Sequence, residues 1–209
     1  MLAYGAKLLR VKGLGTDPDI SARCVQMLLE AGNTPGTAME ISAYKYRPVS
    51  MSGVQTIAYE LADQLAPLPD HVFCQAGGGG MTLAIARGFA QLVELGRIPR
   101  SPKVECVQSA GNDTMAGPLR DGREKGQNIQ CTSTVSGLQV AVVIDADEVI
   151  PACRASGGTG HLISDEQVWD AQRRLAREDG IFCEPAAAAS VDGALQALDQ
   201  GLVDPNATI

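Results

Sequence analysis

The chain contains four consecutive glycines, Gly77–Gly80, placed between an apolar run and a segment with helical periodicity. The apolar run is Val72–Ala76, and the helical spacing begins near Met81. Glycine adopts positive φ and lets a backbone approach a ligand closely. The first turn of a helix offers unpaired N–H groups at the positive end of its dipole. Strand, glycines and helix together predict a phosphate-binding loop, with a purely structural tight turn as the alternative.

Strand-like runs alternate with helical periods along the chain. We expect strands at 6–12, 71–75, 104–108 and 181–183, and helices at 19–31, 53–65, 82–95, 165–179 and 186–198. Ser164 and Gln167 have capping-box spacing, and Gly180 has the position of a helix C-terminal glycine. This alternation predicts an α/β fold with a mostly parallel sheet and helices on both faces.

The residues after the glycines narrow the type of phosphate ligand. Met81 and Thr82 stand where a Walker A loop has Lys and Ser or Thr. The spacing also fails to match the GxGxxG fingerprint of dinucleotide-binding folds. In parallel sheets, ligands bind beyond the carboxyl ends of strands, which is where this loop falls. A ligand with a single phosphate group is therefore favoured over a nucleotide.

Charge excludes several classes of partner. The 209 residues include 17 basic and 24 acidic side chains, for a net charge of −7, and no basic cluster occurs. Such a chain is a poor candidate for binding nucleic acid or an anionic membrane. No apolar stretch approaches the roughly 20 residues that span a bilayer, and the first residues lack the ordered regions of a signal peptide.

The cysteine pattern indicates a reducing compartment. The six cysteines lie far apart and form no CxxC pair, which fits reduced thiols and not a disulfide frame or a zinc site. The two histidines, His71 and His161, are too few and too isolated to argue for a metal. We therefore expect a cytoplasmic protein without a metal site.

Three motifs occur in an order and spacing that resemble one enzyme family. They are GVQTIAYE at 53–60, DHVF at 70–73 leading into the glycines, and IFCEPA at 181–186. Together they resemble the fold-type II pyridoxal-phosphate enzymes of the tryptophan synthase β-like superfamily, and are most similar to the threonine synthases. The agreement covers most of residues 1–209.

The resemblance implies a two-lobed enzyme with pyridoxal 5′-phosphate (PLP) as cofactor. Residues 1–50 would be the remainder of the smaller lobe and its connector, and residues 51–209 the larger, phosphate-binding lobe. Met81 would begin the helix behind the phosphate, and Glu184 would lie close to the cofactor ring. Glu184 has an alternative reading as an acid favoured by a helix N-terminus. The backbone N–H groups implied to hold the phosphate are those of Gly77, Gly78, Gly79 and Gly80.

Further positions follow from the same comparison. Thr56 and Glu60 match a helix that supports the site, and for them a structural role is favoured. Gln108, Ser109 and Gly111 follow the next strand and are expected to border the substrate pocket.

One departure from the family pattern concerns catalysis. The family's chemistry needs a lysine that forms a Schiff base with the cofactor, and none of this chain's five lysines lies in the corresponding motif. We therefore leave the catalytic residue unassigned and expect the lysine on a second segment or chain. The region after the last residue, where the family has a further strand and a hydroxyl-bearing turn, is also expected elsewhere.

The resemblance thus predicts a PLP-dependent lyase or β/γ-replacement enzyme of amino-acid metabolism, threonine-synthase-like, that is not active as this chain alone. The complete assembly is expected to be a homodimer acting on an amino-acid substrate. Dehydration and racemisation also occur in this superfamily. The alternative is a non-catalytic PLP- or phosphate-binding subunit, or an inactive fragment.

Overall fold

Three parallel strands form the central sheet in the computed structural model, which describes residues 2–209. In the order β1-β2-β3, they are β1 (His71–Gln75), β2 (Lys103–Ser109) and β3 (Gly160–Ile163). The register pairs Phe73 with Glu105 and Val107 with His161. All three carboxyl ends therefore lie at one edge of the sheet, and the glycines follow the end of β1.

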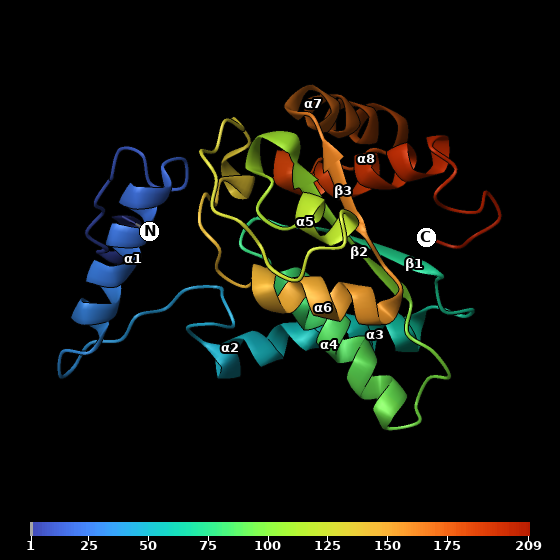
Figure 1. The fold of residues 1–209 in the computed structure, drawn as a ribbon, viewed down its shortest axis with the longest axis horizontal. Helices are drawn as coiled ribbons and strands as arrows, with labels where there is room; N and C mark the ends of the chain where they lie inside the picture. Colours follow the sequence, from blue (N-terminus) through green and yellow to red (C-terminus); the bar gives the residue numbers. More distant parts are fainter. Residues whose placement is uncertain (1) are drawn as a thin grey trace.

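Helices cover both faces of this sheet (Figure 1). Helices α3, α4 and α6 pack on one face, while α7 and α8 pack on the other. The helices are α1 (Pro18–Gly32), α2 (Pro48–Ser52), α3 (Thr56–Gln64), α4 (Gly80–Glu94), α5 (Ala116–Arg120), α6 (Ala146–Ser156), α7 (Asp165–Arg174) and α8 (Pro185–Asp199). A π-helical turn, Leu175–Asp179, extends α7 to Gly180, whose φ of +71° ends the helix. The predicted α/β fold with a parallel sheet is confirmed.

The apolar core is divided by the sheet because successive strand side chains point to opposite faces. Val104 and Cys106 of β2 pack toward Leu83 and Phe89 of α4. Val107 lies on the opposite face of the same strand, where it packs in a second apolar cluster toward α7 and α8. The central strand is thus buried on both faces, as parallel sheets require.

The N-terminal region lies to one side of the layered body (Figure 1). Helix α1 begins after Asp17, whose carboxylate accepts hydrogen bonds from the N–H groups of Asp19 and Ile20. Residues 33–47 lead from α1 to α2. The division into residues 1–50 and 51–209 stays a prediction.

Two expected strands are wrong. Residues 6–12 and 181–183 are irregular, and their apolar side chains are largely exposed, with Leu9 93% and Phe182 84% accessible. Neither segment has a neighbouring strand among residues 2–209 to pair with its backbone groups, and an unpaired segment forms no ladder. The capping box at Ser164 and Gln167 is confirmed.

The sequence analysis did not predict one strand and one helix that packs on the sheet. Strand β3 is only four residues long and follows Gly157, Gly158 and Thr159, and α6 contains Pro151 in its interior. Among residues 2–209, no helix is both long and apolar enough to cross a membrane.

Candidate cofactor-phosphate site

The glycine turn joins the carboxyl end of β1 to the first turn of α4. Gly79 is the residue before the helix and has φ of +97°, while Gly80 is the first helical residue. No side chain in the described part of the chain, residues 2–209, caps this helix. The free helix N-terminus therefore opens directly at the edge of the sheet where the strands end.

A run of unsatisfied donors follows from this geometry. Among residues 2–209, no backbone N–H from Gly77 to Thr82 donates a hydrogen bond to a protein acceptor. Gly79, Gly80 and Thr82 are buried, and the Thr82 Oγ1 is also buried without a partner. The first N–H groups of a helix have no partner within the helix, so these donors are free to bind a ligand. An anion with several oxygens, such as a phosphate group, fits this donor set.

Close packing explains why two of these positions need glycine. A Cβ on Gly79 would lie 2.8 Å from Cγ2 of Val149, and a Cβ on Gly80 would lie 2.8 Å from the carbonyl oxygen of Ser42. Gly79 also has the positive φ that residues with a side chain rarely adopt. Gly79 and Gly80 therefore leave no room for a side chain at these two positions of the turn.

Gln108, near the end of β2, forms hydrogen bonds with the start of the turn. Its Nε2 donates to the carbonyl oxygens of Ala76 and Gly77 at 3.2 and 3.4 Å. Its Oε1 accepts hydrogen bonds from three successive N–H groups, Thr114 to Ala116, at 2.8 to 3.1 Å. The side chain is fully buried. Gln108 thus positions the loop, and its polar atoms are used within the protein.

Asp145 links the same turn to the connector that precedes α2. Its N–H donates to the carbonyl oxygen of Gly78 at 3.1 Å, and its carboxylate accepts from the N–H groups of Tyr44 and Lys45, both at 2.9 Å. Burial raises the pKa of Asp145, and these two N–H groups only partly oppose it. The carboxylate therefore serves as a fixed acceptor between distant segments.

Glu184 approaches the turn through Gly137. A Cβ on Gly137 would lie 3.9 Å from Oε2 of Glu184, and the carbonyl oxygen of Gly137 lies 3.0 Å from where a Cβ on Gly77 would be. Glu184 immediately precedes α8, yet its side chain does not cap that helix. Glu184 is exposed, and its carboxylate has no hydrogen-bond or ion-pair partner among residues 2–209. Its expected place near a cofactor ring stays a prediction.

The loops on the far side of the site are fixed by Asp165. Its carboxylate accepts hydrogen bonds from the hydroxyls of Ser109, Ser133 and Thr134 at 2.7 to 2.8 Å, and from the Thr134 N–H. Burial alone would raise the pKa of Asp165, but these donors outweigh it and hold the pKa below its ordinary value. Gly111 belongs to this arrangement, because its carbonyl oxygen accepts from the Thr132 N–H at 2.9 Å.

Other residues singled out in the sequence lie apart from the turn. Thr56 and Glu60 are exposed on α3, and the Thr56 hydroxyl bonds only the Gly53 carbonyl. The Lys45 ammonium lies 5.7 Å from the centre of the Tyr46 ring. No cluster of three metal-binding side chains occurs within residues 2–209.

Sequence reasoning missed three polar residues of the site. Thr82 was visible as the hydroxyl residue in the first turn after the glycines. Asn112 is fully buried, accepts from the Val140 N–H at 3.0 Å, and leaves its Nδ2 without a partner. Asn112 and Asp145 come from segments whose approach depends on tertiary structure, so no local signal marks them.

Comparison with known proteins places the chain in a family. The profile described as "Pyridoxal-phosphate dependent enzyme" matches residues 1–209, and the chain belongs to that family. The family and its threonine synthase relatives use PLP. The donor set at the glycine turn fits the phosphate of that cofactor.

Two similar proteins are threonine synthases. The chain is 30% identical to threonine synthase of Methanosarcina acetivorans over 212 residues, covering 100% of this chain and 50% of the relative. It is 31% identical to threonine synthase of Methanocaldococcus jannaschii, covering 96% and 48%. The chain thus spans about half the length of the curated relatives it matches.

Solved structures share the fold. The processed form of threonine deaminase isoform 2 from Solanum lycopersicum superposes with a TM-score of 0.69 at 22% identity, covering 87% of this chain and 49% of that one. Cysteine synthase from Entamoeba histolytica gives 0.64 at 19% identity, covering 99% and 53%.

Proposed function

We propose that this chain supplies the cofactor-phosphate site of a PLP-dependent lyase or β/γ-replacement enzyme acting on an amino acid. A threonine-synthase reaction, which converts O-phosphohomoserine and water to threonine and phosphate, is the form that the relatives favour. The observation that carries the proposal is the run of unpartnered N–H groups from Gly77 to Thr82 beside the orphan Thr82 hydroxyl.

The residues of the site have distinct roles in this proposal. Gly77, Gly78, Gly79 and Gly80 donate their N–H groups to the phosphate, and Met81 continues the same helix turn. The Thr82 hydroxyl, otherwise unsatisfied, donates to a phosphate oxygen. Glu184 presents its carboxylate to the ring side of the site. PLP, when bound, supplies the electron sink for amino-acid chemistry.

We further propose that the covalent lysine lies on a second segment or chain. The chain covers about half of each relative, and its lysines lie outside the family motif. Ile181 and Phe182, which precede Glu184 by three and two residues, are 55% and 84% exposed. Apolar side chains beside a candidate site favour a covering segment. We propose a homodimer for the complete assembly, and a cytoplasmic location in keeping with six free thiols.

Intact mass and borohydride reduction test the second segment. The mass of every polypeptide in an active preparation is measured, and the species that retains reduced cofactor is identified. We expect a lysine-bearing partner to carry the label. If a preparation containing only this chain retains covalent cofactor, the lysine lies here and the proposal is wrong on that point.

A Thr82→Val variant tests the phosphate site itself. Valine keeps the shape but removes a buried hydroxyl without a partner, so the variant should be as stable as the wild type or more so. Affinity for PLP should nevertheless fall by about tenfold, the worth of one hydrogen bond to a charged group. Unchanged affinity would contradict the role of Thr82. Thr56→Val, on exposed α3, is the matched control and should leave affinity unchanged. Cofactor binding that survives bulky residues at both Gly78 and Gly79 would overturn the whole assignment.

A further inference from the structure

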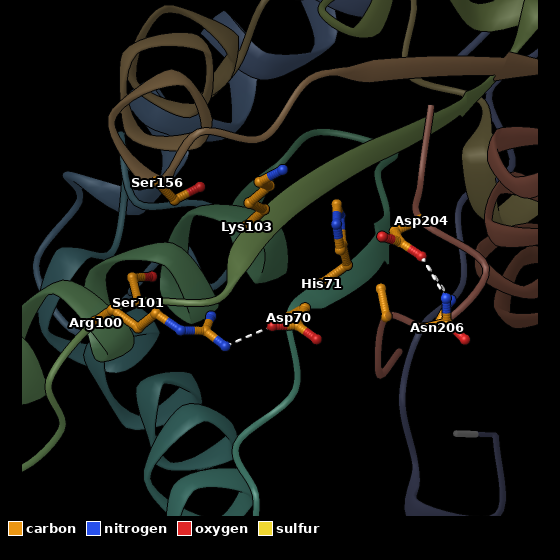
Figure 2. A pocket seen from close by; sticks show the side chains of 9 residues that line it. Asp70, His71, Arg100, Ser101, Lys103, Ser156, Asp204 and Asn206 are labelled. Atoms are coloured by element: carbon orange, nitrogen blue, oxygen red, sulfur yellow. Dashed lines mark hydrogen bonds and ion pairs between the residues drawn. The ribbon is translucent and has the colours of Figure 1, made fainter. Parts of the chain in front are cut away.

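A cavity of about 510 Å³ lies at the amino ends of β1 and β2, the opposite end of the strands from the glycine turn (Figure 2). Its volume is in the range of small-molecule sites. His71, Lys103 and Asp204 line it together with a paired Asp70 and Arg100. Nothing in the proposed function uses these residues.

One pair of charges in the cavity is already neutralised. Oδ1 of Asp70 lies 2.5 Å from the Arg100 guanidinium, and Oδ2 accepts from the N–H and hydroxyl of Thr208 at 3.0 and 3.1 Å. Both oxygens of Asp70 are therefore occupied, and this pair forms part of the wall.

Two opposite charges remain uncommitted. The Lys103 ammonium has no ion-pair partner among residues 2–209. Asp204 accepts from the N–H and the side-chain amide of Asn206 through Oδ1, at 2.8 and 3.1 Å, and its Oδ2 has no partner within residues 2–209. Figure 2 shows Lys103 and Asp204 on opposite sides of His71.

His71 adds a hydrogen-bond acceptor of defined orientation. Its Nδ1 lies 2.8 Å from Oε1 of Glu105, whose Oε2 receives the Thr159 N–H at 2.7 Å and lies 3.1 Å from Nε2 of His161. Burial raises the pKa of Glu105, but these hydrogen bonds outweigh it and hold the pKa below its ordinary value. The ionised carboxylate requires His71 to donate through Nδ1, so neutral His71 carries a lone pair on Nε2.

The His71 Nε2 faces accessible space. This atom has no hydrogen-bond partner in residues 2–209 and is not fully buried. His71 as a residue is only 5% exposed. His71, which lines the cavity, thus keeps one unpaired acceptor, and it lies between an unpaired cation and an unpaired carboxylate oxygen.

We propose that this cavity binds a free α-amino acid. The ligand's ammonium donates to Asp204 Oδ2 and His71 Nε2, and its carboxylate accepts from the Lys103 ammonium. A zwitterion matches both uncommitted charges at once, whereas a simple anion or cation would satisfy only one of them. The site is independent of the proposed function, because it lies at the other end of the sheet.

Calorimetry and imidazole NMR on the whole protein test this binding. The probe is L-threonine, with acetate and methylammonium as single-charge controls. We expect millimolar affinity for L-threonine and a clear shift of the His71 resonances, which are assignable because the chain has two histidines. Lys103→Met and Asp204→Asn should each weaken binding by about tenfold or more.

Matched variants assign the binding to the cavity. Lys125→Met and Asp199→Asn remove exposed charges elsewhere and should leave the affinity unchanged. Thr82→Val, at the glycine turn, should leave the His71 shift unchanged, which separates this site from a substrate site. The proposal is wrong if L-threonine fails to bind, or if it binds Lys103→Met and Asp204→Asn as tightly as the wild type. It is equally wrong if acetate or methylammonium matches the affinity of L-threonine.

Discussion

Gln108 donates a hydrogen bond from Nε2 to the carbonyl oxygen of Ala76, 3.2 Å away, at the point where β1 ends and the glycine turn begins. The other atom of the same amide, Oε1, fixes the loop that starts at Thr114. One side chain of β2 thus aligns two loops at the carboxyl edge of the sheet. The donor array of the turn depends on this positioning.

Gln108→Leu should therefore reduce both stability and cofactor affinity. The N–H groups of Met115 and Ala116 would be left buried without an acceptor, while the Thr114 N–H keeps the carbonyl oxygen of Asn112, so we expect a cost of about 3 kcal/mol in the free energy of unfolding. Urea denaturation measures the loss, and PLP titration measures the effect on the turn. Gln200→Leu, at an exposed position, is the control and should change neither quantity. Equal stability of Gln108→Leu and wild type would show that the amide does not hold these loops.

A second prediction compares two glycines. Gly79→Ala would force a side chain into positive φ and place its Cβ 2.8 Å from Val149, so we expect a loss of about 3 kcal/mol in unfolding free energy together with weakened PLP binding. Gly53→Ala adds a Cβ to open space at φ of −61°. It should be neutral or stabilise by up to about 1 kcal/mol, because alanine narrows the unfolded ensemble. Thermal unfolding of the two variants measures both effects. If Gly79→Ala is as stable as the wild type, the steric explanation for glycine at position 79 is wrong.

The Asp165 network predicts a specific dependence of stability on pH. The folded-state pKa of Asp165 lies below its ordinary value of 3.8, so the unfolded chain binds the proton more readily. Its stabilising effect is fully present above that value and is lost as pH falls through the folded pKa. The stability difference between wild type and Asp165→Asn should therefore shrink as pH falls below about 4. Denaturant titrations from neutral pH downward measure it, and a difference that grows on acidification would contradict the sign. Asp170→Asn, on the exposed side of α7, is the control.

The local sequence predicts the part of the candidate site that one continuous segment of the chain forms. β1, the glycines and α4 follow one another along the chain, so the apolar run, the missing Cβ atoms and the helical period predict their arrangement. The strand His71–Gln75 and the helix that follows the glycines form as expected. The expected site residues Gly77 to Met81 form one continuous turn.

The remainder depends on contacts that no local pattern encodes. β3 begins at Gly160 and is recognisable only through its pairing with β2. α6 tolerates Pro151 because it is held by packing at buried Val149 and Ile150. Residues 181–183 have a strand-like composition but no strand beside them. Asp145 bonds the Gly78 carbonyl oxygen of the turn and also Tyr44, which lies about a hundred residues away in the sequence.

Glu184 provides a test that separates its two interpretations. A carboxylate that only favours a helix N-terminus would contribute about 0.5 kcal/mol to stability and nothing to the cofactor. A carboxylate beside the ring would alter the electronic environment of bound PLP. Because the side chain does not cap α8 and lies near Gly137, we expect Glu184→Gln to leave stability within about 0.5 kcal/mol while shifting the absorption maximum of bound PLP in the reconstituted enzyme. Glu178→Gln removes a carboxylate in the π-helical turn and should leave the spectrum unchanged. A stability loss without any spectral change would assign Glu184 to the helix and not to the site.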